Sequence, residues 1–208
     1  MADQSFTTDQ EAFWAGAFGD AYVDRSQGAD LVAARTALWS QILRRCSPVG
    51  SVTEFGANVG LNLMALRRLL PRVALKAVEI NPKACAVLET LDGVEAHQGS
   101  FLDTAPATPS DLAFTCTVLI HINPERLKEA YAQIYKAASR YVVICEYYNP
   151  TPVEVSYRGH AERLFKRDFA GEMMDAHPDL DLLDYGFVYH RDPLFPTDDF
   201  TWFLMEKR

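Results

Sequence analysis

One stretch, residues 52–62 (VTEFGANVGLN), constrains the fold of this chain more than any other. It predicts a short apolar strand, a turn and the start of a helix, because Gly56 and Gly60 flank a segment where the backbone can come close to a ligand. Asn58, between them, tolerates a left-handed backbone. The pattern departs from the dinucleotide motif G-x-G-x-x-G, whose second and third glycine positions hold Asn and Leu here. Glu54, just before the turn, suits a cationic ligand better than a phosphate.

A second acidic residue follows at the spacing expected of a doubly wound fold. Residues 75–81 (LKAVEIN) predict the next strand, with Glu79 at its carboxyl end, nineteen positions after Gly60. In such folds an acidic residue about 20 positions past the glycine turn accepts hydrogen bonds from ribose hydroxyls. The alternative is that Glu79 ends a solvated strand and that the turn is an ordinary strand-to-helix connection. The pair of features together predicts a nucleoside site.

Length, charge and leader sequence limit what the chain can be. Its 208 residues fit one domain, and its net charge of −8, with a pI near 5.1, argues against nucleic acid as the main partner. An anionic small molecule remains compatible with a local basic patch. The N-terminus lacks the basic and apolar regions of a signal peptide, and no apolar run is long enough to span a membrane. We therefore expect a cytoplasmic protein without a membrane partner, and its oligomeric state stays open.

The cysteines and other metal-ligating residues indicate neither a disulfide framework nor a metal site. The four cysteines lie 39, 31 and 29 residues apart in apolar stretches, which predicts buried thiols in a reducing compartment. No cluster of His, Asp or Glu at ligand spacing appears near the ends of the fourth and fifth predicted strands. We expect no metal.

Hydrophobic periodicity predicts alternating strands and helices after an N-terminal helical segment. A capping box at Thr8 opens a helix over about 8–19, and a second helix covers 30–46. The strands are expected at 51–55, 74–79, 94–98, 112–118, 141–146, 180–189 and 200–206, and further helices at 58–69, 82–91, 124–138 and 161–176. Such alternation predicts an α/β, Rossmann-like fold with a seven-stranded, mostly parallel sheet and helices on both faces. We expect one domain in three parts: an N-terminal helical cap (1–48), the cofactor-binding units (49–146) and an acceptor-side loop, helix and two last strands (147–208).

The glycine turn and the acidic strand end resemble motifs I and II of the class I S-adenosylmethionine-dependent methyltransferases. The resemblance implies S-adenosylmethionine as cofactor and an enzyme that transfers its methyl group. It implies that the first two strand ends contact the cofactor through Glu54, Phe55, Gly56, Ala57, Asn58, Gly60, Asn62, Glu79, Ile80 and Asn81.

The remaining cofactor contacts implied by this resemblance come from three other segments. Ser100 and Phe101 follow the third strand, where the family holds adenine, although many members have Asp in place of Ser100. Thr117 and Val118 lie at the carboxyl end of the fourth strand, beside the methionine part. In the N-terminal segment, Tyr22 or Arg25 is expected to meet the cofactor carboxylate. The alternatives are that Phe101 belongs to the core and that Arg25 lies on a solvated turn.

Further stretches resemble one particular family, the pseudaminic acid biosynthesis-associated methylases. They are residues 13–22 (FWAGAFGDAY), 146–160 (EYYNPTPVEVSYRGH), 164–174 (LFKRDFAGEMM) and 184–192 (DYGFVYHRD), besides the glycine turn. The resemblance implies a small-molecule acceptor: a nonulosonic, pseudaminic-type sugar acid, its nucleotide-activated form or a precursor. The alternatives are another metabolite, or a cofactor-binding protein without transfer activity.

The loop over 147–160 is long enough to be functional. Tyr147, Tyr157 and Arg158 are its candidate acceptor-binding residues, and Lys166 and Arg167, in the predicted helix, are further candidate cations. The candidate catalytic residues are His160, His121, Glu146 and Tyr148. His160 ranks first as general base because it ends the long loop, and imidazole titrates near neutral pH. An amine acceptor that binds unprotonated needs no base at all.

Overall fold

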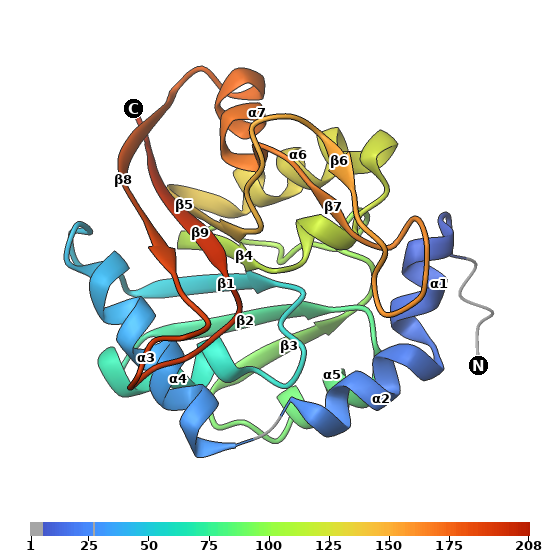
Figure 1. Cartoon of the computed structure of the whole chain (residues 1–208). Helices are drawn as coiled ribbons and strands as arrows, with labels where there is room; N and C mark the ends of the chain where they lie inside the picture. The colour runs from blue at the N-terminus through green and yellow to red at the C-terminus, as the bar shows by residue number, and fades with distance from the viewer. Residues whose placement is uncertain (1–5, 27) are drawn as a thin grey trace.

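The structure is a computed structural model that describes residues 6–26 and 28–208. Its centre is a seven-stranded sheet in the order β3-β2-β1-β4-β5-β9-β8 (Figure 1). The first five strands of this sheet along the chain are parallel, and β9 runs antiparallel between β5 and β8. The strands are β1 (Ser51–Phe55), β2 (Ala74–Glu79), β3 (Val94–Gln98), β4 (Ser110–Cys116), β5 (Ala138–Glu146), β8 (Leu180–Val188) and β9 (Phe200–Lys207). The predicted seven-stranded, mostly parallel sheet is confirmed.

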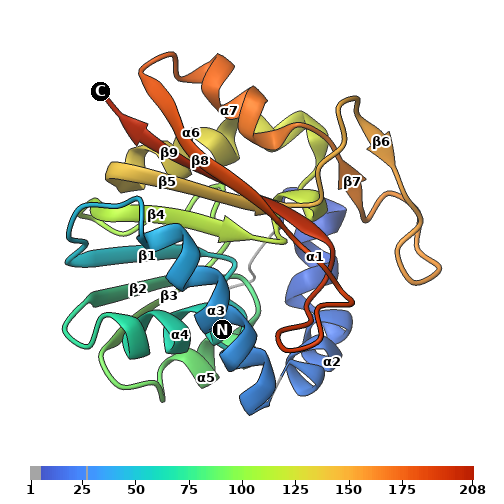
Figure 2. The same cartoon turned by 60° about the vertical axis from the view of Figure 1, so that its left-hand side comes forward.

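Helices cover both faces of the sheet (Figures 1 and 2). The helices α3 (Ala29–Leu43), α4 (Leu61–Leu69) and α5 (Pro82–Leu88) pack on one face, where Trp39 meets Phe114 at a ring distance of 4.5 Å. On the other face lie α6 (Leu127–Ala137) and α7 (Phe169–Ala176), with Ile134 fully buried. Strand β5 contributes alternate residues to both cores, so the apolar run predicted over 141–146 is buried from both sides.

The strand order reverses between β1 and β4, and open α/β sheets bind ligands in the crevice at the carboxyl ends of such strands. The turn after β1 has the backbone that the sequence predicts, with positive φ at Gly56 (72°), Asn58 (48°) and Gly60 (80°). A Cβ added at Gly56 would lie 2.5 Å from the Val118 side chain, so the turn fits closely against the end of β4.

The N-terminal cap differs from the single helix expected over 8–19. It forms α1 (Asp9–Ala15) and α2 (Ala17–Arg25), which meet at Gly16, and both lie along the carboxyl edge of the sheet (Figure 1). The predicted capping box is present, since the Thr8 side chain accepts from the Glu11 amide and the Glu11 carboxylate accepts from the Thr8 amide. Residues 1–5 of the expected leaderless N-terminus lie outside the described residues.

The prediction of a helix over 161–176 is wrong for the first half of that range. Residues Val153–Glu154 (β6) and Phe165–Lys166 (β7) pair as an antiparallel ribbon, which makes Lys166 extended rather than helical. The helix α7 begins only at Phe169, where the Asp168 side chain accepts from the Gly171 amide as an N-cap. Two short 3₁₀ turns, Leu119–His121 (η1) and Pro124–Arg126 (η2), connect β4 to α6. In the described part of the chain, no helix is long and apolar enough to cross a membrane.

The core between α6 and the sheet gives a stability prediction. Ile134→Ala deletes a fully buried side chain and should lower the free energy of unfolding by about 2–5 kcal/mol. The matched control is Lys128→Ala, at an exposed position of the same helix, which should stay within about 0.5 kcal/mol of the wild type. Urea unfolding followed by circular dichroism measures both. Equal effects of the two changes would contradict this packing.

Candidate active site

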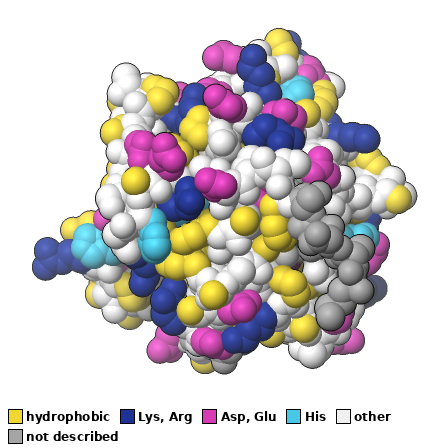
Figure 3. Space-filling view, turned by 90° about the vertical axis from the view of Figure 1, so that its right-hand side faces the viewer, with side chains coloured by type: hydrophobic (Ala, Val, Ile, Leu, Met, Phe, Trp, Pro, Cys, Tyr) yellow, Lys and Arg dark blue, Asp and Glu magenta, His cyan; other side chains and the backbone are white. Residues whose placement is uncertain are grey.

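A cavity of about 270 Å³ lies at the carboxyl ends of β1, β2 and β4, under the α1–α2 cap. Its volume is near the lower end of the range usual for small-molecule sites. Figure 3 shows the side of the molecule that carries the cap, where hydrophobic side chains gather near the middle among charges of both signs. The cavity brings together most of the residues that the sequence predicts: Tyr22, Glu54, Gly56, Ala57, Asn58, Asn62, Glu79, Ile80, Asn81, Ser100, Phe101, Thr117, Val118, His121, Tyr147, Tyr157 and Arg158.

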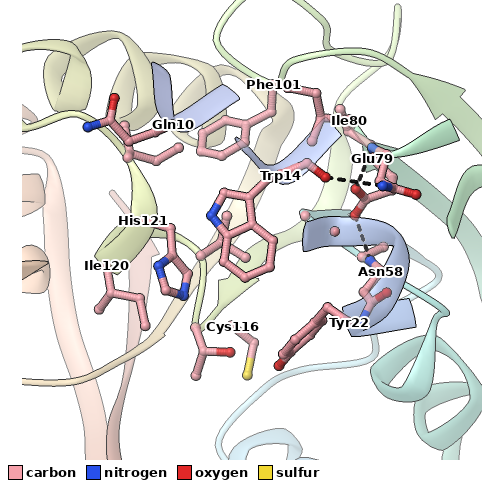
Figure 4. Close-up of a pocket in the computed structure, with 18 of the residues that line it drawn as sticks. Gln10, Trp14, Tyr22, Asn58, Glu79, Ile80, Phe101, Cys116, Ile120 and His121 are labelled. Carbon is pink, nitrogen blue, oxygen red and sulfur yellow. Dashed lines mark hydrogen bonds between the residues drawn. The ribbon is translucent and has the colours of Figure 1, made fainter. Parts of the chain in front are cut away.

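Glu79 lies at one end of the cavity, beside Phe101 and Ile80 (Figure 4). One carboxylate oxygen accepts from the Asn58 amide at 2.7 Å and the other from the Asn81 amide at 2.8 Å. Burial raises the pKa of Glu79, whereas these backbone hydrogen bonds favour its ionised form. Each carboxylate oxygen has a second lone pair, so the group can also accept bonds from a diol.

Glu54 lies deeper, at the end of β1, and is only 2% exposed. The Asn62 side chain donates to its Oε1 at 2.7 Å, and the Trp39 indole in turn donates to Asn62 Oδ1 at 3.1 Å. The other oxygen, Oε2, is buried and has no hydrogen-bond partner among the described residues. Burial raises the pKa of Glu54 well above its usual range. An unpartnered carboxylate oxygen facing a cavity fits a ligand that donates hydrogen bonds.

Arg35, on α3, is the cation of this end of the cavity, and sequence reasoning missed it. Its Nη1 donates to Cys116 Sγ at 3.4 Å, and among the described residues no carboxylate lies within ion-pair distance of it. The signal was present, since Arg35 follows Val32 by three positions and precedes Trp39 by four, on the buried side of the helix. The predicted Arg25 is instead exposed and lies over the rings of Phe18 and Tyr22.

His121 lines the opposite part of the cavity, next to Trp14 (Figure 4). Its ring lies 4.6 Å from Trp14 and 4.9 Å from Tyr157, and its Nδ1 is 2.5 Å from the Arg163 carbonyl. A carbonyl only accepts, so Nδ1 carries the proton and Nε2 has a free lone pair. Burial lowers the pKa of His121 to about 4, which keeps the ring neutral near pH 7.

The other three catalytic candidates do not line the cavity. His160, the preferred base, is exposed and packs 5.1 Å from Phe13, because the loop that it ends folds over the outside of α1. Glu146 accepts from the backbone amides of Val118 and Leu119, so it holds the turn after β4. Tyr148 is 44% exposed and does not line the cavity, and its backbone pairs with Arg167.

Two predicted cofactor contacts and two predicted cations also lie elsewhere. Phe55 packs against Phe101 in the core below the cavity, and Gly60 supplies the left-handed residue before α4. Arg167 forms an ion pair with Glu172 at 2.6 Å, and Lys166 lies 5.2 Å from the Tyr147 ring.

Several cavity residues come from segments that sequence reasoning did not assign to the site. Trp14, on α1, lines the cavity, and its Nε1 is buried without a partner among the described residues. Gln10 lies beside it on α1, and Asp198 comes from the β8–β9 connection. No group of three or more His, Cys, Asp or Glu that could hold a metal ion occurs within residues 6–26 and 28–208.

The chain has the fold of the class I, Rossmann-like methyltransferases. It is similar to an amino pentose methyltransferase from Micromonospora echinaspora (13% identity, 92% of this chain, 96% of that chain, TM-score 0.64). It is also similar to magnesium protoporphyrin IX methyltransferase from Synechocystis (11% identity, 99% of this chain, 100% of that chain, TM-score 0.66). A third similar structure is a didemethyltoxoflavin N1-methyltransferase from Burkholderia thailandensis (14% identity, 99% of this chain, 93% of that chain, TM-score 0.68). No protein-family model and no curated protein matches the sequence. The resemblance to the pseudaminic acid-associated methylases therefore stays a prediction.

The state of His121 gives a pH prediction. Its folded pKa of about 4 is below the usual 6.5, so the unfolded chain binds the proton more tightly between these values. Stability from this group is complete above pH 6.5 and is lost as the pH falls toward 4, by up to about 3 kcal/mol. His121→Gln should remove this loss, whereas His160→Gln, at an exposed ring, should keep it. Urea unfolding at a series of pH values measures the effect, and parallel profiles for wild type and His121→Gln would refute it.

Proposed function

We propose that this protein is an S-adenosylmethionine-dependent methyltransferase that acts on a small molecule. The observation that carries the proposal is a pair of buried carboxylates, Glu54 and Glu79, at the ends of neighbouring parallel strands on either side of a glycine turn. When bound, the cofactor supplies a methyl group on a sulfonium, which is already a strong electrophile.

The residues present fit this cofactor at each of its parts. The free Oε2 of Glu54 suits the ammonium of the methionine part, and the Arg35 guanidinium suits its carboxylate. Glu79 suits the ribose diol, with Phe101 and Ser100 beside it for the adenine. Gly56, which lines the cavity and packs closely against the Val118 side chain, completes the cradle. The neighbours in the fold comparison that are described with bound S-adenosylmethionine or S-adenosylhomocysteine agree with this assignment.

For the acceptor we propose a nonulosonic, pseudaminic-type sugar acid, its nucleotide-activated form or a precursor. Tyr147 and Tyr157 offer apolar faces to a sugar, and Arg158, on the cavity wall, offers a cation to a carboxylate or phosphate. On a chain with a net charge of −8, such a cation at a ligand cavity favours an anionic acceptor. Another metabolite is the alternative, since the similar structures are named for an amino pentose, a porphyrin and a toxoflavin precursor.

The chain's own contribution to the reaction is alignment and a proton acceptor. Holding two reactants in line supplies about 7–11 kcal/mol in favourable cases. We assign the role of base to His121 rather than His160, because its unprotonated Nε2 belongs to a ring that lines the cavity. It would accept the proton that an acceptor hydroxyl loses during attack. A positioned base adds about 10²–10⁴-fold in rate, and the low pKa of this ring places its contribution at the lower end of that range.

The cofactor assignment predicts a large effect of Glu79→Ala. Losing the charge-assisted bonds to the ribose should cost roughly 1.5–3 kcal/mol, which is about ten- to a hundredfold in affinity for S-adenosylhomocysteine. The control is Glu95→Ala on the neighbouring strand β3, where the carboxylate is exposed and outside the cavity. Titration calorimetry measures both, and an unchanged affinity of a folded Glu79→Ala would refute the assignment.

The base assignment predicts opposite results for two histidines. The assay detects S-adenosylhomocysteine formed from S-adenosylmethionine in the presence of a panel of free and nucleotide-activated sugar acids. With an active acceptor, His121→Ala should lower kcat about a hundredfold, with cofactor affinity kept, because the acceptor hydroxyl loses its base. His160→Ala should retain most of the turnover, since that ring lies outside the cavity. The reverse result would return the role to His160, and full activity of both variants would leave alignment alone.

A further inference from the structure

Two thiols lie side by side at the carboxyl end of the sheet. Cys116 ends β4, and Cys145 is its register partner on β5. Both are buried, yet Cys116 lines the cavity, on the same side as Tyr22 (Figure 4). Cys145 lies behind it and does not line the cavity. One sulfur is therefore open to whatever enters the cavity, and a second lies next to it.

The surroundings of Cys116 favour its thiolate, which is the reactive form of a cysteine. Interaction with the neighbouring Cys145 thiol and the positive charge of the Arg35 guanidinium, whose Nη1 lies 3.4 Å from Sγ, lower the pKa of Cys116. The charged or titratable groups near this sulfur are Arg35 from α3, Cys145 and Glu146 from β5, Glu54 from β1, Tyr22 from α2 and Asp198 from the β8–β9 connection.

The other cysteines provide a contrast. Cys46 is more exposed than Cys116, but burial raises its pKa to about 11. Cys85, on α5, is 2% exposed, and burial raises its pKa as well. Neither lines the cavity. Exposure alone would make Cys46 the first thiol to react, whereas the electrostatic surroundings single out Cys116.

A separate observation indicates that a ligand occupies this end of the cavity. The Oε2 atom of Glu54 is buried, unpartnered among the described residues, and belongs to a side chain that lines the same wall as Cys116. A hydrogen-bond donor bound there would cover the sulfur. Under the proposed function, that donor is the ammonium of the cofactor.

We propose that Cys116 is a reactive thiol that the bound cofactor shields, and that its modification by soft electrophiles or peroxides excludes the cofactor. The shielding by the cofactor, and the exclusion of the cofactor by a modified Cys116, rest on the proposed function. The reactivity of the thiol rests only on the geometry of Cys116, Arg35 and Cys145. An alkyl group or oxygen added to Sγ occupies part of the cavity, and alkylation, sulfenic acid and the disulfide each remove the thiolate partner of Arg35, a cation of the cavity.

The oxidation step balances with a peroxide as the oxidant. The Cys116 thiolate attacks one peroxide oxygen, so an S–O bond forms, the O–O bond breaks and hydroxide leaves, which a proton converts to water. The sulfenic acid formed on Cys116 is then attacked by Cys145 sulfur, which closes the disulfide and releases a second water. Two thiols lose two electrons in total, and the peroxide gains them.

The experiment measures alkylation of each cysteine by iodoacetamide in the folded protein near neutral pH, by peptide mass spectrometry. Cys116 should react about tenfold or more faster than Cys46, although Cys46 is more exposed. Saturating S-adenosylhomocysteine should slow Cys116 about tenfold and leave Cys46 unchanged. Arg35→Met should slow Cys116 in the absence of any ligand, because the thiolate loses its cation.

A peroxide arm tests the second thiol. Hydrogen peroxide should produce a Cys116–Cys145 disulfide and abolish binding of S-adenosylhomocysteine in calorimetry, and dithiothreitol should restore both. Cys145→Ser should instead accumulate the sulfenic acid on Cys116, which dimedone traps as a mass adduct. Cys85→Ser is the matched control and should behave as the wild type.

Each outcome decides one part of the proposal. Reaction of Cys116 no faster than that of Cys46 overturns the reactive thiol. Fast reaction with no protection, in a protein that calorimetry finds to bind S-adenosylhomocysteine, overturns the shielding. If calorimetry detects no binding of S-adenosylhomocysteine, the proposed function fails, and fast alkylation of Cys116 would still support the reactive thiol.

Discussion

The site depends on one buried carboxylate that the fold holds with a single side chain. Glu54 is buried near the carboxyl end of β1. The side chain of Asn62, eight positions later on α4, donates to one of its oxygens. Asn62 is itself fixed by the Trp39 indole of α3. This chain of three side chains joins the first strand to the two helices that cover it. It sets the direction of the turn between β1 and α4, and hence the place where the backbone approaches the cavity.

Burial of such groups works against folding unless something offsets the lost hydration. Among the described residues, Glu54 leaves one oxygen unpartnered, and Arg35 has a hydrogen bond to a sulfur and lies over the Phe200 ring, without a carboxylate partner. Charges of opposite sign therefore face one cavity, each without its ideal partner, which costs stability in the free protein. A zwitterionic amino acid group would pair with both at once. The same imperfect pairing leaves Arg35 next to Cys116, which is why a thiol at this position is activated.

The sequence predicts the parts of this site that are local. Glu54, Gly56 and Glu79 could be predicted from the sequence, because a strand, a turn and the end of the next strand follow one another at fixed spacing. Gln10 and Asp198 could not be predicted, because each reaches the cavity through the packing of a helix or connection distant in sequence. The spacing of Arg35 indicates only the buried side of its helix, and the packing of that helix places it at the cavity. The helix expected at 161–168 failed for a similar reason, since pairing with β6 outweighs a local helical pattern there.

The long loop has a different role from the one expected of it. The sequence predicts His160, at the end of this loop, as the base, because a loop of this length is often functional. In the structure, the backbone carbonyls of two consecutive residues after His160 hold two cavity residues. The Glu162 carbonyl accepts from the Gln10 side-chain amide at 3.0 Å, and the Arg163 carbonyl accepts from His121 Nδ1. The loop thereby ties the cap to the turn after β4. It fixes the tautomer of His121, so under the proposed function the loop orients a base that another element supplies.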